Sequence, residues 1–293
     1  MFIVTLLVDP KSPTLDPALV ENLRNAWGGG DAIWLAPDEA AEFDVAVQPD
    51  TFETTHNDLL AMGIDLAIQP EQGRKKSLLL ADMDSTMIGQ ECIDELAAEA
   101  GFGERVAAIT ARAMNGELDF EAALIERVSL LKGLDLSVID QVLEHRISMA
   151  PGGATLVATT KSQGGHAALV SGGFTAFTEV VATKLGFDEH RANTLLHDDG
   201  KLTGDVARPI LGRDAKVAAL TDICARLGIS TDQAMAVGDG ANDLGMLDAA
   251  GAGVALHAKS IVAEQAAIRI DHGDLTALLY LQGYAKSEFQ EVA

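Results

Sequence analysis

Two aspartates in the stretch LLLADMDSTMIGQE, Asp82 and Asp84, are the clearest candidates for chemistry in this chain. They flank one methionine and directly follow the apolar run LLLA, which is typical of a buried strand. Side chains two residues apart on a strand point to the same side, so both carboxylates should project at its carboxyl end, where doubly wound α/β sheets bind ligands. Beside a phosphate, each pair of like unit charges at ~5 Å costs ~3 kcal/mol at an effective dielectric of ~20. A phosphate site here would therefore need a cation.

A third aspartate, Asp239, follows the apolar run AMAV in the way that Asp82 follows LLLA. If the two runs form neighbouring parallel strands, their carboxyl ends bring these carboxylates together. Mg²⁺ prefers oxygen ligands and usually takes one or two protein carboxylates, leaving its other positions to water and substrate phosphate. Asp82 and Asp239 are therefore predicted to hold Mg²⁺.

Other interpretations of these motifs fail at particular residues. The pattern D-x-D-x-T has roughly a one-in-ten chance of arising from composition in so aspartate-rich a chain, so it carries little weight alone. An EF-hand opening at Asp82 would need glycine where Met87 stands and glutamate where Ile93 stands. GDGANDLG lacks the third glycine of a dinucleotide fingerprint, and the sequence contains no G-x-x-x-x-G-K-[ST] motif. Nucleotide-binding folds are therefore disfavoured.

The elements that must position these residues are apolar runs that each end in small or polar residues. HAALV (166–170) is followed by SGG, AMAV (234–237) by GDGAND, and GVAL (253–256) by HAK. Short, purely apolar runs of this kind indicate strands buried on both faces of a parallel sheet. Helices are predicted in PGGATLVATTKSQG and AKVAALTDICARLG, and a β-hairpin in ANTLLHDDGKLTGDV with Asp199-Gly200 as its turn.

Residues 1–70 show a separate alternation of strand and helix signals in the order βαββαβ. This ferredoxin-like pattern is similar to the small ACT-type regulatory domains attached to amino-acid enzymes. Such domains often use a glycine between the first strand and helix, which DPKSPTLD lacks, so a packing or dimerisation module is preferred to a ligand-binding one. Residues 71–77 are predicted to be a linker and 78–293 the larger domain, with a helical insertion at about 91–149. The strands predicted before the linker are 2–8, 32–36, 43–47 and 64–68, and the helices are 15–27 and 51–63.

The composition indicates a folded, soluble protein. Hydrophobic residues make up 48% and charged residues 22%, and no apolar run is long enough to span a bilayer. With 44 acidic against 21 basic residues, the formal net charge of −23 argues against nucleic-acid or membrane partners. The start, MFIVTLLVDP, lacks the basic residues of a secretory signal, so a cytoplasmic location is predicted. Cys92 and Cys224 are expected to be buried, reduced thiols.

Four motifs resemble in order and spacing those of the haloacid dehalogenase superfamily: DMDST, VSGG, Lys216 opening a helix, and VGDGAND. Asp84 resembles the second aspartate that marks the phosphatase branch. Over residues 78–285 the resemblance narrows to the phosphoserine phosphatase family, through DMDSTMIGQE, TARAMNGELDFEAALIERVSLLKGL, LVSGGF, AVGDGANDLGML and GVALHAK. It implies an α/β fold with a Rossmann-like parallel sheet and a helical cap inserted after its first strand, beside the small ACT-like α+β domain.

The resemblance also implies hydrolysis of O-phospho-L-serine to L-serine and phosphate, the last step of serine biosynthesis. Asp82 would be the nucleophile that forms an aspartyl-phosphate. Asp84 would protonate the leaving serine oxygen and then activate water. Lys216 would neutralise Asp82 and a phosphate oxygen. Mg²⁺ would be held by the Asp82 carboxylate, the Asp84 carbonyl and Asp239, with Asp243 supporting them.

Residues that contact the substrate are implied in two places. Near the phosphoryl group, Ser171, the Gly172 amide and Asn242 would donate hydrogen bonds. Each of these three would otherwise be an ordinary turn residue. Together with Lys216 they would form one phosphate site.

In the cap, the resemblance places Glu91 near the substrate ammonium and Arg127 on the substrate carboxylate, a pairing suited to bidentate contact. Met114 and Phe120 would cover the substrate. The alternatives are a surface arginine at position 127 and ordinary core packing for Met114 and Phe120.

Two other functions remain open from the sequence. One is hydrolysis of another small phosphomonoester, or transfer of its phosphoryl group to an amino alcohol. The other is a catalytically silent amino-acid sensor. The second is disfavoured because a binding site gains nothing from a leaving-group acid such as Asp84.

Overall fold

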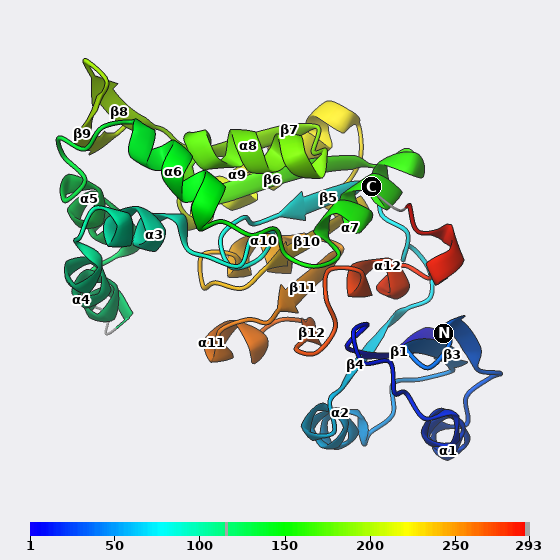
Figure 1. The fold of residues 1–293 in the computed structure, drawn as a ribbon. Helices are drawn as coiled ribbons and strands as arrows, with labels where there is room; N and C mark the ends of the chain where they lie inside the picture. The colour runs from blue at the N-terminus through cyan, green and yellow to red at the C-terminus, as the bar shows by residue number, and fades with distance from the viewer. Residues whose placement is uncertain (115–116, 291–293) are drawn as a thin grey trace.

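The computed structural model describes residues 1–114 and 117–290. Figure 1 shows three parts: a central sheet covered by helices, a helical cap toward which strand β5 (Leu78–Ala81) points, and an N-terminal unit set apart from the cap. Within the described residues, no helix is both long and apolar enough for a bilayer crossing. The α/β fold predicted from the sequence is confirmed.

The central sheet has six strands in the order β12-β11-β10-β5-β6-β7, and every neighbouring pair is parallel. Strand β5 lies between β10 and β6, and Ala81 pairs with Val237, so Asp82 and Asp239 leave the sheet on adjacent strands. This confirms the adjacency expected from the two apolar runs. The other strands are β6 (His166–Phe174), β7 (Glu189–Asn193), β10 (Ala234–Gly238), β11 (Ala252–Leu256) and β12 (Ile268–Ile270).

The run LLLA is apolar throughout because helices cover both faces of the sheet. Leu79 and Ala81 belong to the cluster formed with α7, α8 and α12, whereas Leu78 and Leu80 pack with α9 and α10. The helices around the sheet are α7 (Gly153–Ser162), α8 (Thr175–Leu185), α9 (Arg213–Leu227), α10 (Leu244–Ala249), α11 (Ser260–Ala263) and α12 (Ala277–Leu281). Two single turns of 3₁₀ helix complete this part, η1 (Thr231–Gln233) and η2 (Lys286–Glu288).

The cap is helical, as the spacing in residues 91–149 predicted. The chain enters and leaves it side by side, because Ile88 and Met149 form an antiparallel bridge and the Gly89 amide donates to the Ser148 carbonyl at 3.1 Å. The cap helices are α3 (Cys92–Glu99), α4 (Gly103–Met114), α5 (Phe120–Ser129) and α6 (Ser137–His145).

A β-hairpin lies against the cap, formed by β8 (Leu195–Asp198) and β9 (Lys201–Val206). Its turn is Asp199-Gly200, both with positive φ, which confirms the predicted turn. The Gly133 amide donates to the Leu202 carbonyl at 2.8 Å and so joins the hairpin to the cap.

The N-terminal unit has the predicted order βαββαβ and forms an antiparallel sheet in the order β2-β3-β1-β4. Its elements are β1 (Phe2–Val8), α1 (Pro17–Trp27), β2 (Ile33–Ala36), β3 (Ala40–Val45), α2 (Phe52–Ala61) and β4 (Ile64–Pro70). The strand predicted at 43–47 was misplaced, because β3 pairs with β1 from Leu7↔Ala40 to Phe2↔Val45. Val47 lies beyond that pairing and is exposed. The limits at 70 and 78 stay a prediction.

Buried polar contacts join the N-terminal unit to the core. The Asp65 carboxylate in β4 accepts hydrogen bonds from the amides of Asp271, His272 and Gly273, at 2.8, 3.0 and 2.7 Å. Burial raises the pKa of Asp65, and these amides oppose the shift. A second contact is the Tyr280 hydroxyl, which donates to Glu39 at 2.6 Å. The two units are therefore packed against each other.

Replacing Asp65 by alanine is expected to lower the free energy of unfolding by about 3 kcal/mol, because it leaves three amides without their acceptor. Urea denaturation measures this change, with the exposed Asp50→Ala as the control. Equal stabilities of the two variants would contradict the inferred role of Asp65.

Candidate active site

A cavity of about 420 Å³ opens between the carboxyl edge of the sheet and the cap. Its core side comes from the loops after β5, β10 and β11 and from the end of β6, which runs past the predicted limit at 170 and includes the SGG motif. Its cap side comes from Glu91 and from helices α3, α4 and α5. Most predicted site residues meet here. Those that line the cavity are Asp82, Asp84, Glu91, Phe120, Arg127, Ser171, Gly172, Asp239 and Asn242.

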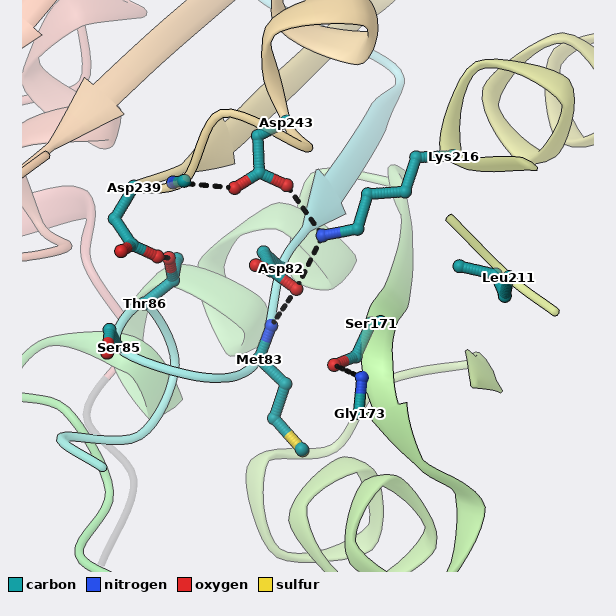
Figure 2. A network of polar contacts seen from close by, with 12 residues as sticks. Asp82, Met83, Ser85, Thr86, Ser171, Gly173, Leu211, Lys216, Asp239 and Asp243 are labelled. Carbon is teal, nitrogen blue, oxygen red and sulfur yellow. Dashed lines mark hydrogen bonds and ion pairs between the residues drawn. The ribbon is translucent and has the colours of Figure 1, made fainter. Parts of the chain in front are cut away.

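Below this cavity, Lys216 lies between two carboxylates. Its Nζ atom is 2.7 Å from Asp82 Oδ1 and 2.6 Å from Asp243 Oδ1. Figure 2 shows the amine of Lys216 between these two carboxylates. The lysine stands in the first turn of α9 and is fully buried. Burial alone would lower the pKa of Lys216, but the two carboxylates raise it, so the amine is held as a cation. This brings Asp82 together with Lys216 and Asp243, which lie more than a hundred positions later in the sequence.

Asp82 is held in a fixed orientation. In addition to Lys216, the Met83 amide donates to its Oδ1 atom at 2.8 Å. The side chain is almost fully buried, and burial raises its pKa, as does the nearby Asp243, while Lys216 opposes the shift. No described residue donates a hydrogen bond to its other oxygen, Oδ2. That oxygen is therefore the one available to an incoming group.

Asp84 also lines the cavity, but for a different reason from the one the sequence suggested. Strand β5 ends at Ala81, so Asp82 and Asp84 lie in the following loop and not on one face of a strand. The Cys92 amide at the start of α3 donates to Asp84 Oδ1 at 3.3 Å. Burial, with a contribution from Glu91, raises the pKa of Asp84 to about 7. At neutral pH this carboxyl can therefore both hold and release a proton.

The glycines of the SGG motif allow the chain to pass close to these carboxylates. A Cβ atom at Gly173 would lie 2.8 Å from Asp84 Oδ2, and one at Gly172 would lie 3.0 Å from the Phe120 ring. The Gly173 amide donates to Ser171 Oγ at 2.9 Å (Figure 2). A side chain at either glycine would therefore intrude on the site.

Three carboxylates could hold a metal ion at the carboxyl edge of the sheet. Asp82, Asp239 and Asp243 each offer an oxygen within 4.8 Å of the others, and all three are buried. Burial raises the pKa of Asp239 to about 6, and the Thr86 hydroxyl donates to its Oδ1 atom at 3.1 Å. Two cations face these three carboxylates, because Lys216 contacts Asp82 and Asp243 and Lys259 lies 3.7 Å from Asp239. The oxygen ligands and the excess negative charge fit a hard divalent cation such as Mg²⁺.

Asp243 is less available to a metal than the other two. Its Oδ1 atom contacts Lys216, and its Oδ2 atom accepts the Gly240 amide at 2.9 Å. Asp243 therefore orients Lys216 and the loop that carries Asp239. This is consistent with the supporting role implied for it.

On the cap side, the Glu91 carboxylate is held by Ser85, whose hydroxyl donates to Glu91 Oε1 at 3.0 Å. Arg127 projects from α5, and its Nε atom donates to the Ala123 carbonyl at 3.2 Å. Burial lowers the pKa of Arg127, while Asp94 and Glu91 oppose the shift. Arg127 is therefore a partly buried cavity residue and not the surface arginine that was the alternative.

Met114 is the one predicted site residue whose side chain lies outside the described residues. Its backbone ends helix α4. Phe120 lines the cavity and also packs against the main core cluster, so the packing given as its alternative is present, and its role in covering the substrate stays a prediction.

Several residues in or beside the site were missed from the sequence. Lys259 lines the cavity with its Nζ atom 3.7 Å from both Glu91 and Asp239. It follows the third apolar run, so the rule that found Asp239 could have found it. Asn193 is buried and donates to the Gly172 carbonyl at 2.8 Å, which fixes the SGG segment at the end of β6. The polar strand that carries Asn193 gave no such signal.

Comparison with known proteins agrees with this geometry. Residues 79–248 match the haloacid dehalogenase-like hydrolase family. A phosphoserine phosphatase from Streptomyces coelicolor is 40% identical over 295 residues, which cover 98% of this chain and 72% of that protein. A HAD family hydrolase from Salmonella enterica serovar Typhi superposes with a TM-score of 0.86 at 32% identity, covering 96% of this chain and 98% of that one. A structure described as a phospho-aspartyl intermediate analogue of phosphoserine phosphatase gives a TM-score of 0.66 at 43% identity. The match covers 70% of this chain and 98% of that one.

Proposed function

We propose that this chain, which belongs to the haloacid dehalogenase-like hydrolase family and within it to the phosphoserine phosphatases, hydrolyses O-phospho-L-serine to L-serine and inorganic phosphate. One observation carries the chemistry: a buried Asp82 carboxylate, fixed by Lys216, faces a cavity beside Asp84, which can hold a proton near neutral pH. The phospho-aspartyl analogue of the related enzyme supports the same type of intermediate here.

In the first half-reaction, Asp82 Oδ2 attacks phosphorus and a P–O bond forms to the aspartate. The bond between phosphorus and the serine oxygen breaks, and the electron pair leaves with that oxygen. Asp84 gives its proton to the same oxygen, so serine departs as a neutral alcohol. Lys216 holds Asp82 in place and opposes the rise in its pKa that burial causes.

In the second half-reaction, Asp84 is a carboxylate and takes a proton from a water molecule as the water oxygen attacks phosphorus. The bond from phosphorus to Asp82 breaks, which releases phosphate and restores both aspartates. We assign Ser171, the Gly172 amide and Asn242, which line the cavity, to contacts with the phosphoryl oxygens. Positioning by several fixed groups suits phosphoryl transfer, in which the protein acts mainly through geometry and charge.

Mg²⁺ is the cofactor that we propose for this site. It would be held by the carboxylates of Asp82 and Asp239 and by the main-chain carbonyl of Asp84, with Asp243 fixed behind them. When bound, Mg²⁺ would neutralise negative charge on the phosphoryl group and on the carboxylates.

The serine part of the substrate would lie on the cap side. We assign Glu91 to the substrate ammonium and Arg127 to its carboxylate, with Phe120 covering the substrate. Glu91 and Arg127 both line the cavity, and their charges are opposite to those of the groups that they would bind.

Arg127→Ala is expected to lower kcat/KM for phosphoserine by roughly 10²-fold, because a charge-assisted contact to the substrate carboxylate is lost. Phosphoethanolamine, which lacks that carboxylate, should be hydrolysed at nearly the wild-type rate. Steady-state kinetics on both substrates measure the effect. Equal losses on the two would show that Arg127 does not bind the carboxylate.

Asp84→Asn is expected to lower kcat on phosphoserine by roughly 10²- to 10⁴-fold, because the leaving oxygen no longer receives a proton. p-Nitrophenyl phosphate has a leaving group that needs little protonation, so the first half-reaction should survive with it while the second stays slow. Stopped-flow measurements should then show a burst of nitrophenolate. If both substrates lose the same activity without a burst, Asp84 is not the general acid.

The proposed activity is tested with a substrate panel at fixed Mg²⁺. We expect the highest kcat/KM for L-phosphoserine among L-phosphoserine, D-phosphoserine, phosphothreonine and sugar phosphates, and loss of turnover with EDTA. A preference for another phosphomonoester, or transfer of the phosphoryl group to an amino-alcohol acceptor, would contradict phosphoserine hydrolysis as the activity. The aspartyl-phosphate mechanism would still stand. Absence of turnover on the whole panel would favour the silent-sensor alternative.

We further propose that the N-terminal unit, residues 1–70, mediates homodimer formation. Strand β2 is at the edge of its sheet, and Ile33 on that strand is exposed. We also propose a cytoplasmic location, and the net charge of −23 argues against nucleic-acid and membrane partners. Sedimentation of the full chain tests the dimer.

A further inference from the structure

Lys259 is a cavity residue whose charge has no role in the two half-reactions described above. It stands just after the loop that follows β11, and its amide donates to the Asp239 carbonyl at 3.1 Å, so its backbone is tied to the loop carrying Asp239. Its Nζ atom is 3.7 Å from Glu91 Oε1 and 3.7 Å from Asp239 Oδ2. One flexible ammonium group therefore faces both the proposed substrate-ammonium site and a proposed metal ligand.

Two other cationic residues of the site, Lys216 and Arg127, already have partners or assigned roles. Lys216 is buried between Asp82 and Asp243, and Arg127 lies on α5, where we assign it to the substrate carboxylate. The side chain of Lys259 is half exposed and sits at 3.7 Å from each partner, which is an ion-pair contact without a short hydrogen bond. Such a group supplies charge to its neighbours without fixing their positions.

We propose that Lys259 sets the specificity of the site by shielding Glu91 and Asp239. Its positive charge weakens the attraction of Asp239 for a divalent cation, and it competes with the substrate ammonium for the Glu91 carboxylate. In return, it reduces the repulsion that these two carboxylates exert on an incoming phosphate. The competition at Glu91 rests on the proposed function, because it assumes that the substrate carries an ammonium group. The effect on the divalent cation does not depend on the substrate.

The charge balance predicts the sign of each effect of removing Lys259. Without it, Glu91 and Asp239 are less shielded, so Mg²⁺ should bind more tightly. A substrate that carries an ammonium group should gain at Glu91 relative to one that does not. The hydroxyl analogue of phosphoserine is 3-phosphoglycerate, which keeps the phosphate and the carboxylate and replaces only the ammonium group.

The test compares wild type with Lys259→Met, Lys259→Arg and the control Lys184→Met, which removes an exposed lysine outside the cavity. In Lys259→Met we expect the Kd of Mg²⁺, measured by calorimetry without substrate, to fall by about 5-fold, as one unit charge near 4 Å in a water-like medium implies. The ratio of kcat/KM for phosphoserine to that for 3-phosphoglycerate should rise by about the same factor. Both changes should shrink in high salt, and Lys259→Arg should restore wild-type values.

The ratio cancels any general loss of phosphate binding or of folded protein, because the two substrates share the same enzyme sample. An unchanged Mg²⁺ affinity in Lys259→Met, a ratio that falls, or equal effects in Lys184→Met would overturn the proposal. Wild-type enzyme that does not prefer phosphoserine to 3-phosphoglycerate would refute the proposed function, and the Mg²⁺ titration would then decide the role of Lys259 alone.

Discussion

Replacing Asp82 by asparagine is expected to lower kcat on phosphoserine by roughly 10⁵-fold or more, as loss of a nucleophile does in other covalent catalysts. Asparagine keeps the shape of the side chain but offers only a neutral amide in place of the attacking oxygen. Asp82→Ala should lose as much activity. Because alanine cannot deamidate to aspartate, this variant shows whether residual activity of Asp82→Asn comes from deamidation. Phosphate release from phosphoserine measures both variants.

The loss should not come from unfolding. Burial raises the pKa of Asp82, so the protein gains little stability from ionising this group, and Lys216 retains its contact with Asp243. Urea denaturation of Asp82→Asn should therefore give nearly the wild-type free energy of unfolding. If the alanine variant loses less than roughly 10²-fold of the wild-type kcat, the assignment of Asp82 as the nucleophile is contradicted.

Removing Lys216 is expected to damage both stability and activity. In Lys216→Met the carboxylates of Asp82 and Asp243 lose their shared cation in a fully buried place, which should lower the free energy of unfolding by about 3–5 kcal/mol. kcat should also fall by roughly 10³-fold, because Asp82 loses the cation that holds it and that opposes the rise in its pKa. Urea denaturation and kinetics at saturating Mg²⁺ measure the two effects.

A second substitution separates the electrostatic cause from a packing defect. Adding Asp243→Asn to Lys216→Met removes one of the two unpaired charges, so part of the lost stability should return. The exposed lysine variant Lys184→Met serves as the charge control. If Lys216→Met is as stable as that control, or if Asp243→Asn only adds to the loss, the buried ion-pair network is not what holds this site together.

The core of the fold could be predicted from the sequence because its strands are short apolar runs that end in polar residues. LLLA and AMAV are buried on both faces, and the aspartates that follow them meet where the runs pair. Strands β7 and β12 were missed for physical reasons. β7 reads EHRAN and lies at the edge of the sheet, and β12 has only 3 residues. Neither shows the apolar run that marks a doubly buried strand.

The site could be predicted as far as its residues lie next to strand ends or in motifs. Asp82, Asp239 and the SGG motif were found by that rule, although the strand before SGG continues through it to Phe174. The resemblance supplied Lys216 and Arg127. What could not be predicted depends on contacts between distant segments. Asn193 fixes the SGG segment from a polar edge strand, and Lys259 reaches Glu91 across the cavity. Spacing along the chain contains no information on such pairs.

The most direct measurement is the chemical identity of the phosphorylated residue. Enzyme mixed with phosphoserine labelled at phosphorus and quenched in acid within one turnover should carry the label on a single peptide, attached to Asp82 through an acyl-phosphate bond that hydroxylamine cleaves. The label should be absent from Asp82→Asn and should persist longer in Asp84→Asn. Labelled phosphate that appears in wild type with no labelled protein, or a label on any residue other than Asp82, would contradict the proposed mechanism.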